Sequence, residues 1–141
     1  MNAKHTAAAS LAALVLLVLT ACAGTVPGTG DPLDGTSWIL TTYGTSSLIP
    51  GTEITLEWEG GEVSGSAGCN IYGGSYRVSG DSISVTDLYN TEMACMEPEG
   101  VMDQEQDFLK LLRDARSFKI VDEHLQIFTA QEEALTFARA E

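Results

Sequence analysis

Apolar and polar residues alternate along much of the chain after its first third, and this period of two predicts β-strands. In one such segment Ile54, Leu56 and Trp58 share a side, while Glu57 and Glu59 lie on the other. One apolar and one acidic side indicate a strand with one face in the core and one in solvent. A similar alternation predicts a first strand over residues 36–43.

Pairs of turn residues join the predicted strands into hairpins. Gly60-Gly61 follows residues 54–59, Gly80-Asp81 follows residues 71–78, and Asp122-Glu123 separates 118–120 from 125–127. The return strands are predicted at residues 63–67 and 83–85, with further strands at 88–95 and 135–137. The small residues in 63–67 indicate that another part of the chain approaches closely there.

The period changes to that of a helix after Pro98. From Val101 to Ala115 the apolar positions form a helical stripe, with acidic residues near the beginning and basic residues near the end, which suits the helix dipole. Strands, one helix and more strands give an α+β order.

The first 21 residues have the pattern of a signal peptide. Lys4 precedes an apolar run from Ala7 to Leu19, about 13 residues long, whereas a membrane-spanning helix needs roughly 20. The run ends in Leu19-Thr20-Ala21-Cys22, which resembles a bacterial lipobox. We therefore predict that residues 1–21 are removed and that Cys22 carries lipid. The alternative is an ordinary secretory signal in which the Cys is incidental.

Residues 22–35 are rich in Gly, Pro and Thr and are predicted to be a flexible tether of roughly 20 Å between the lipid and a domain at residues 36–141. Ala23 follows Cys22, and Asp is the residue associated with inner-membrane retention at that position. We therefore expect an outer-membrane location in a two-membrane bacterium, and otherwise the outer face of the cytoplasmic membrane.

The chain is acidic, with 20 Asp and Glu residues, seven Lys and Arg residues and a formal net charge of −13. Such a charge argues against nucleic acid as a partner and against lying flat on anionic lipid. It favours solubility or a basic partner, so the lipid anchor is the expected membrane contact.

Cys69 and Cys95 remain after the predicted lipidation of Cys22, and exported proteins keep disulfides. A bridge would close a loop of about 26 residues, a stabilisation of roughly 3.5 kcal/mol on the chain-entropy model. A structural disulfide is favoured over a redox pair because neither Cys belongs to a Cys-x-x-Cys motif. No Cys/His cluster surrounds His124, so no metal site is expected.

Two segments carry a family resemblance. The first is Gly65-Ser66-Ala67-Gly68-Cys69-Asn70, followed by Tyr72, Gly74 and Tyr76, and the second is Thr91-Glu92-Met93-Ala94-Cys95. They resemble the two signatures of the META domain family, which includes the HslJ-like heat-shock lipoproteins. Glu105, Phe108 and Leu112 fit the helix that follows, and Gly35 to Trp38 fits the opening strand.

The resemblance implies a small antiparallel β-sheet curled into a barrel-like shape, with one α-helix inserted before the last strands. It also implies a link to envelope stress, but no established activity. The residues themselves have structural interpretations. Asn70 is expected to hold a turn, and Tyr72 and Tyr76 to lie in the core. Met93, Met96 and Met102 are expected to fill gaps between helix and sheet, with a soft-metal site as the alternative.

No catalytic constellation is evident, because His124 is the one His after the signal peptide and no nucleophile elbow or phosphate loop accompanies it. We therefore expect a monomeric, non-enzymatic protein without a cofactor that binds or stabilises another envelope component. Two alternatives remain: a carrier with a small apolar ligand or acyl chain inside the barrel, and an enzyme of unknown type.

Overall fold

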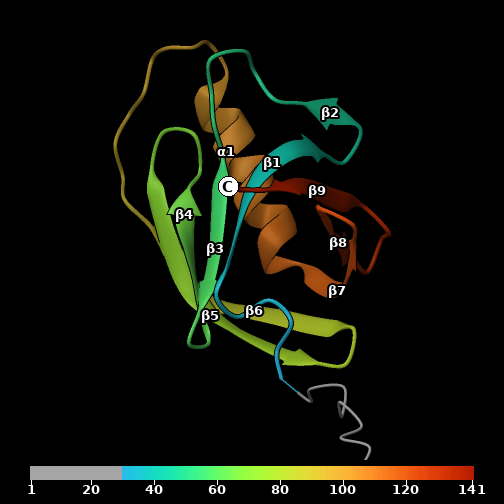
Figure 1. The fold of residues 1–141 in the computed structure, drawn as a ribbon. Coiled ribbons are helices and arrows are strands. Elements are labelled where there is room, and N and C mark those ends of the chain that lie inside the picture. Colours follow the sequence, from blue (N-terminus) through green and yellow to red (C-terminus); the bar gives the residue numbers. More distant parts are fainter. Residues whose placement is uncertain (1–29) are drawn as a thin grey trace, which may run out of the picture.

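The structure is a computed structural model that describes residues 30–141 (Figure 1). The predicted signal peptide, the lipidation site Cys22 and residues 22–29 of the predicted tether lie outside the described residues. Within residues 30–141, no helix combines the length and apolar character needed to cross a membrane.

Eight antiparallel strands within the described residues close into a barrel, which confirms the predicted architecture. The barrel strands are β1 (Thr36–Tyr43), β3 (Thr55–Glu59), β4 (Glu62–Ser66), β5 (Ile71–Ser79), β6 (Ser82–Asn90), β7 (Ala115–Val121), β8 (His124–Thr129) and β9 (Ala134–Arg139). Pairing of β1 with β9 closes the barrel, and the short β2 (Ser46–Ser47) pairs with the end of β1. Helix α1 (Val101–Arg113) lies between β6 and β7 in the chain (Figure 1).

The predicted hairpins form at the expected turns. Gly60 and Gly61 both have positive φ, 60° and 85°, and they join β3 to β4 with Glu59 opposite Glu62. A two-residue turn of this kind needs positive φ at both positions, which Gly adopts without steric cost.

The predicted close approach beside β4 occurs at Gly65. A Cβ atom at this position would collide with the backbone carbonyl of Thr55. Gly65 therefore lets β4 approach the beginning of β3 more closely than any larger residue would.

One predicted strand is wrong in its bounds. Residues 88–95 are not a separate strand, because β6 continues from Ser82 to Asn90 and residues 91–100 then leave the sheet. The backbone N–H of Met93 donates to the side chain of Asn70 instead of to a neighbouring strand. Asp87, with a φ of 54°, lies where the register of β5 and β6 shifts.

The pairing between β6 and β7 is the shortest in the barrel. These strands are paired only at Ser82 and Ser117, and α1 packs against β6, β8 and β9 beyond that point. Phe108 and Leu112 of the helix are completely buried. The rest of the core is made mostly by side chains from the strands, the largest being Trp38, Trp58, Phe137, Leu56, Leu125, Ile127 and Leu135.

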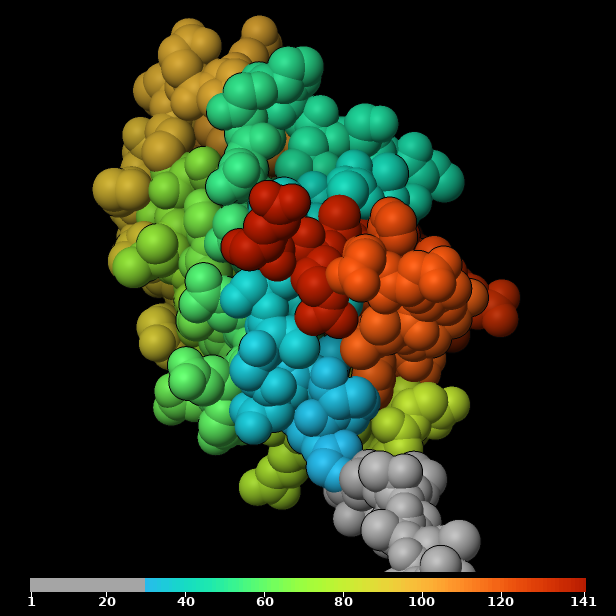
Figure 2. All heavy atoms as spheres, viewed as in Figure 1, coloured from blue at the N-terminus to red at the C-terminus, as the bar shows by residue number. Residues whose placement is uncertain are grey.

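The domain begins before residue 36, which corrects the predicted tether. Leu33 is 0% exposed, and its backbone N–H donates to Asp31. Gly35 donates to the carbonyl of Trp58, and Asp34 accepts from the N–H of Gly60. Figure 2 shows the first described residues, in blue, against the green segment near residue 60 and the red C-terminal segment. Burial of Leu33 and the hydrogen bonds of Asp34 and Gly35 together fix this segment to the barrel.

We predict that Leu33→Ala lowers the free energy of unfolding by about 2–5 kcal/mol, because it removes a completely buried side chain and leaves a cavity. Val121→Ala is the control, since Val121 is 54% exposed and its truncation should change stability by about 0.5 kcal/mol or less. Urea unfolding of the mature protein measures both. Equal effects of the two substitutions on the free energy of unfolding would indicate that Leu33 belongs to the tether and not to the folded domain.

Candidate functional site

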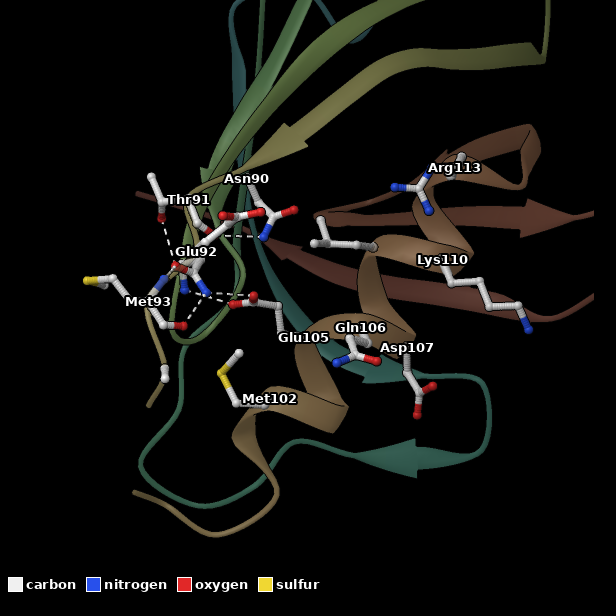
Figure 3. A pocket seen from close by; sticks show the side chains of 13 residues that line it. Asn90, Thr91, Glu92, Met93, Met102, Glu105, Gln106, Asp107, Lys110 and Arg113 are labelled. Carbon is white, nitrogen blue, oxygen red and sulfur yellow. Dashed lines mark hydrogen bonds between the residues drawn. The ribbon is translucent and has the colours of Figure 1, made fainter. Parts of the chain in front are cut away.

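A cleft of about 750 Å³ lies between one side of α1 and residues 90–94, which are the last residue of β6 and the segment that follows it (Figure 3). Met93, Met102 and Leu109 give it an apolar part, and Asn90, Lys110 and Arg113 line its polar part. The second family motif therefore forms one wall of the cleft, and the helix forms the other.

Asn70 forms part of the cleft lining and is only 1% exposed. Its Nδ2 donates to Glu105 Oε1 at 2.8 Å and to the carbonyl of Met93 at 3.2 Å. Its Oδ1 accepts from the Thr91 hydroxyl at 2.8 Å and from the Met93 N–H at 2.7 Å. The side-chain amide has two donors and two lone pairs, and all are used. Asn70 therefore holds a much longer segment than the single turn that the sequence predicts.

Glu105 is the other half of this network. Its carboxylate is 2% exposed, and its second oxygen accepts from the backbone N–H of Asn70 at 2.7 Å. A buried carboxylate is tolerated when donors satisfy its oxygens, and here one residue supplies a donor to each. The pair fixes α1 against the beginning of β5.

Gln104 is a buried polar residue that the sequence interpretation missed. Its Oε1 accepts from the N–H of Ile49 at 2.7 Å, and its Nε2 donates to the Thr52 hydroxyl at 2.9 Å. It thus fastens the segment before β3 to the helix. The available signal was spacing: Gln104 and Glu105 are three and four residues after Val101, so they occupy positions of the helix's buried stripe.

The predicted disulfide between Cys69 and Cys95 is present, with the two Cα atoms 6.0 Å apart. It joins the residue before Asn70 to the end of the segment that Asn70 binds. Residues 91–95 are therefore attached to the barrel at both ends, by hydrogen bonds near Thr91 and Met93 and by a covalent bond at Cys95.

The two motif tyrosines lie in the core, as predicted, and they do not line the cleft. Tyr72 donates to the carbonyl of Thr55 at 2.8 Å and stacks edge-on against Phe108, with ring centroids 5.4 Å apart. Tyr76 packs edge-on against Trp58 at 4.5 Å. Burial, with a smaller effect of the Glu57 carboxylate, raises the pKa of Tyr72 well above its ordinary value. Its hydroxyl therefore stays protonated at neutral pH.

The prediction that the methionines fill gaps is wrong for two of the three. Met93 is 57% exposed and Met96 is 82% exposed, because residues 91–100 cross the surface instead of entering the sheet. Met102 is partly buried on α1 and faces the cleft (Figure 3). Within residues 30–141 no group of three or more His, Cys, Asp or Glu residues is arranged to hold a metal ion.

The remaining motif residues lie at or near the cleft. Gly68 has a φ of 106°, a conformation that suits Gly, at the turn before Cys69. Ala94 lines the cleft beside Met93. The two motifs, far apart in sequence, therefore meet at one place in the fold.

The charged groups at the cleft have opposite signs. Lys110 and Arg113 border its far part, and Glu92 and Asp107 also line it. Neither basic residue forms a salt bridge within residues 30–141, where the one salt bridge joins Arg139 to Glu123. Figure 3 shows the Arg113 side chain directed over the cleft toward the Asn90 side. The cleft therefore offers cationic donors that no side chain of the described domain pairs with.

We predict that Glu105→Gln lowers the free energy of unfolding by about 1–3 kcal/mol, because a carboxamide has one oxygen and leaves one of the two Asn70 donors without an acceptor. Asp103→Asn, at an exposed position in the first turn of the same helix, should change it by about 0.5 kcal/mol or less. Chemical unfolding of both variants tests the network. A stability of the Glu105→Gln protein equal to that of the control would contradict it.

The chain resembles three solved structures. One is the NMR structure of a protein from Burkholderia xenovorans, with 28% identity, a TM-score of 0.64, and coverage of 84% of this chain and 96% of that one. A second NMR structure has 19% identity and a TM-score of 0.61, covering 75% and 90% of the two chains. The crystal structure of a DUF4847 family protein from Bacteroides vulgatus has 10% identity and a TM-score of 0.57, covering 76% and 94%. The last two likenesses show the fold alone.

No curated protein matches the chain significantly. The model of the META domain matches residues 31–141, which include both motifs, the helix and the buried Leu33. The chain therefore belongs to the META domain family.

Proposed function

We propose that this META domain protein is a lipid-anchored component of the bacterial cell envelope, which binds another envelope protein through the cleft and has no catalytic role. The observation that carries the proposal is the contrast between a filled barrel and an open, preorganised cleft beside it. This contrast favours binding of a partner at the surface cleft over binding of a ligand inside the barrel.

The barrel interior argues against the carrier alternative. Trp38, Trp58 and Phe137 are each at most 1% exposed and occupy the space that an acyl chain would need. Barrels that carry ligands keep this space free, whereas small barrels without a ligand fill it with side chains. A carrier function would therefore require the core to rearrange.

The cleft has the properties of a binding site. Its volume of about 750 Å³ lies within the range of ligand pockets, about 300–1,000 Å³. Met93 is exposed at its border, and Met side chains adapt to different partners because they are flexible and polarisable. The Asn70 hydrogen bonds and the disulfide hold the wall in place before a partner arrives, which lowers the entropic cost of binding.

The sequence supports the anchor. The apolar run of about 13 residues ends at a lipobox-like Leu19-Thr20-Ala21-Cys22, and the packed domain begins only a few residues later, near Asp31. A short connection keeps the domain close to the membrane surface, where an envelope partner would be found. The family resemblance to heat-shock lipoproteins supports a role in envelope stress.

We predict that Cys22→Ser moves the protein from the membrane fraction to the soluble fraction and abolishes incorporation of a fatty-acid probe. Lipidation of Cys22 supplies the anchor, and two or more acyl chains hold a protein firmly. Replacement of Thr20 by Ser, which keeps a small residue before the cut, is the control and should retain the label. An unlabelled wild-type protein would rule out the anchor.

We predict that a photo-crosslinking amino acid at position 93 yields a discrete adduct with another envelope protein in living cells, because Met93 borders the cleft and is 57% exposed. The same amino acid at position 121 is the matched control. Val121 has a similar exposure, 54%, but it is not part of the cleft. Identical adducts from both positions, or none from position 93, would contradict cleft-mediated binding.

A further inference from the structure

The edge of β6 is unpaired where it reaches the cleft. β6 pairs with β5 along its length but with β7 only at Ser82 and Ser117. We propose that the cleft binds an extended peptide segment of the partner, which adds to β6 as a further strand and places a carboxylate at Arg113. This inference rests on the proposed function and specifies how the partner is recognised.

The register of the sheet shows which backbone groups are available. Tyr72 lies opposite Asn90, and the N–H of Thr91 donates to the carbonyl of Ile71. In an antiparallel pair of this kind, the residues on either side form the interstrand bonds, so the N–H and C=O of Asn90 point away from β5. Because Asn90 lines the cleft, these two groups are positioned to pair with an incoming strand.

Side chains at the cleft can contact such a strand from both sides. Met93 belongs to the segment that continues from β6, and Met102 and Leu109 belong to the helix on the opposite wall. A strand has side chains alternating between two faces, so an extended peptide beside Asn90 would place apolar residues toward these groups at every second position. Main-chain hydrogen bonds would give affinity, and the apolar contacts would give preference for sequence.

Charge complementarity identifies the carboxylate. Arg113 reaches over the cleft and, like Lys110, has no salt-bridge partner within residues 30–141. Glu92, Glu105 and Asp107 also line the cleft, but none of these carboxylates forms a salt bridge with Arg113. The Arg guanidinium matches a carboxylate by two parallel hydrogen bonds, whether the group is an acidic side chain or the C-terminus of the peptide.

The test selects peptides on the mature, lipidated protein in detergent micelles. A library of random dodecapeptides, displayed on their encoding nucleic acid, is the probe. We expect enrichment of sequences rich in β-branched residues with at least one carboxylate, and one enriched peptide is then synthesised for binding measurements. Failure to enrich any sequence on the wild-type protein over a protein-free surface would overturn the inference.

Two pairs of variants test the two contacts. Asn90→Pro and Asn90→Ala both remove the side chain, but only Pro removes the outward N–H, and neither removes a bond to β5. We expect the Pro variant to bind the peptide at least about tenfold more weakly than the Ala variant. A tenfold change corresponds to about 1.4 kcal/mol, which is within the range for the loss of one hydrogen bond. Arg113→Ala should weaken binding by about tenfold or more, whereas Arg116→Ala, outside the cleft, should not.

Hydrogen exchange keeps the test decisive if the Pro variant does not fold. Binding of the peptide should slow exchange of the Asn90 amide by about tenfold or more, since that N–H becomes paired. Unchanged exchange, or equal binding by the Pro and Ala variants, would overturn strand addition. Formation of a dimer of this chain through position 93 would also overturn it, by identifying a second copy as the occupant.

The two proposals fail separately. Adducts at position 93 in cells together with an unprotected Asn90 amide would leave cleft binding intact and reject strand addition. A protected Asn90 amide together with an unlabelled, soluble wild-type protein would keep strand addition and reject the envelope anchor.

Discussion

The hydrogen bonds between Asn70 and Glu105 hold together the part of the fold that is not a regular barrel. A buried carboxylate must be bound by donors, and Asn70 supplies one from its backbone and one from its side chain. The rest of the same amide binds Thr91 and Met93. One residue therefore joins β5, the helix and the segment that leaves β6, and the disulfide then secures the end of that segment. The cleft wall depends on this network because no sheet hydrogen bond holds Met93.

The inserted helix has a cost for the barrel and a consequence for function. Strands β6 and β7 separate after a single pair of residues, and α1 packs against β6, β8 and β9. An open strand edge is a risk in a β-protein, because it can pair with other chains. Here the edge at Asn90 is exposed and borders the cleft together with Met93 and the helix. An extended chain that fits the cleft would pair with this edge and cover it.

Local features of the fold were predictable from the sequence, and features made by distant residues were not. Alternation in residues 54–59 and the Gly60-Gly61 turn act within one hairpin, so the pattern alone identifies them. The alternating pattern wrongly predicts a strand at residues 91–95, because Thr91 and Met93 form hydrogen bonds with Asn70, which is more than 20 residues away in sequence. The sequence predicts that Leu33 belongs to a tether, because its neighbours are turn residues. Its burial depends on contacts that the barrel forms only when complete.

The charges of the molecule act on a partner in two ways, through the net charge at long range and through the side chains of the cleft at short range. A net charge of −13 repels acidic partners at a distance, but salt screens this repulsion beyond roughly 8–10 Å. Within the cleft, Lys110 and Arg113 lie among the carboxylates of Glu92 and Asp107 without a salt bridge to either, and their position near the end of α1 is explained by the helix dipole. The same placement that stabilises the helix therefore leaves two cations beside an open strand edge. A segment with one carboxylate and little other negative charge can pair with Arg113 and adds little repulsion from the acidic groups around the cleft.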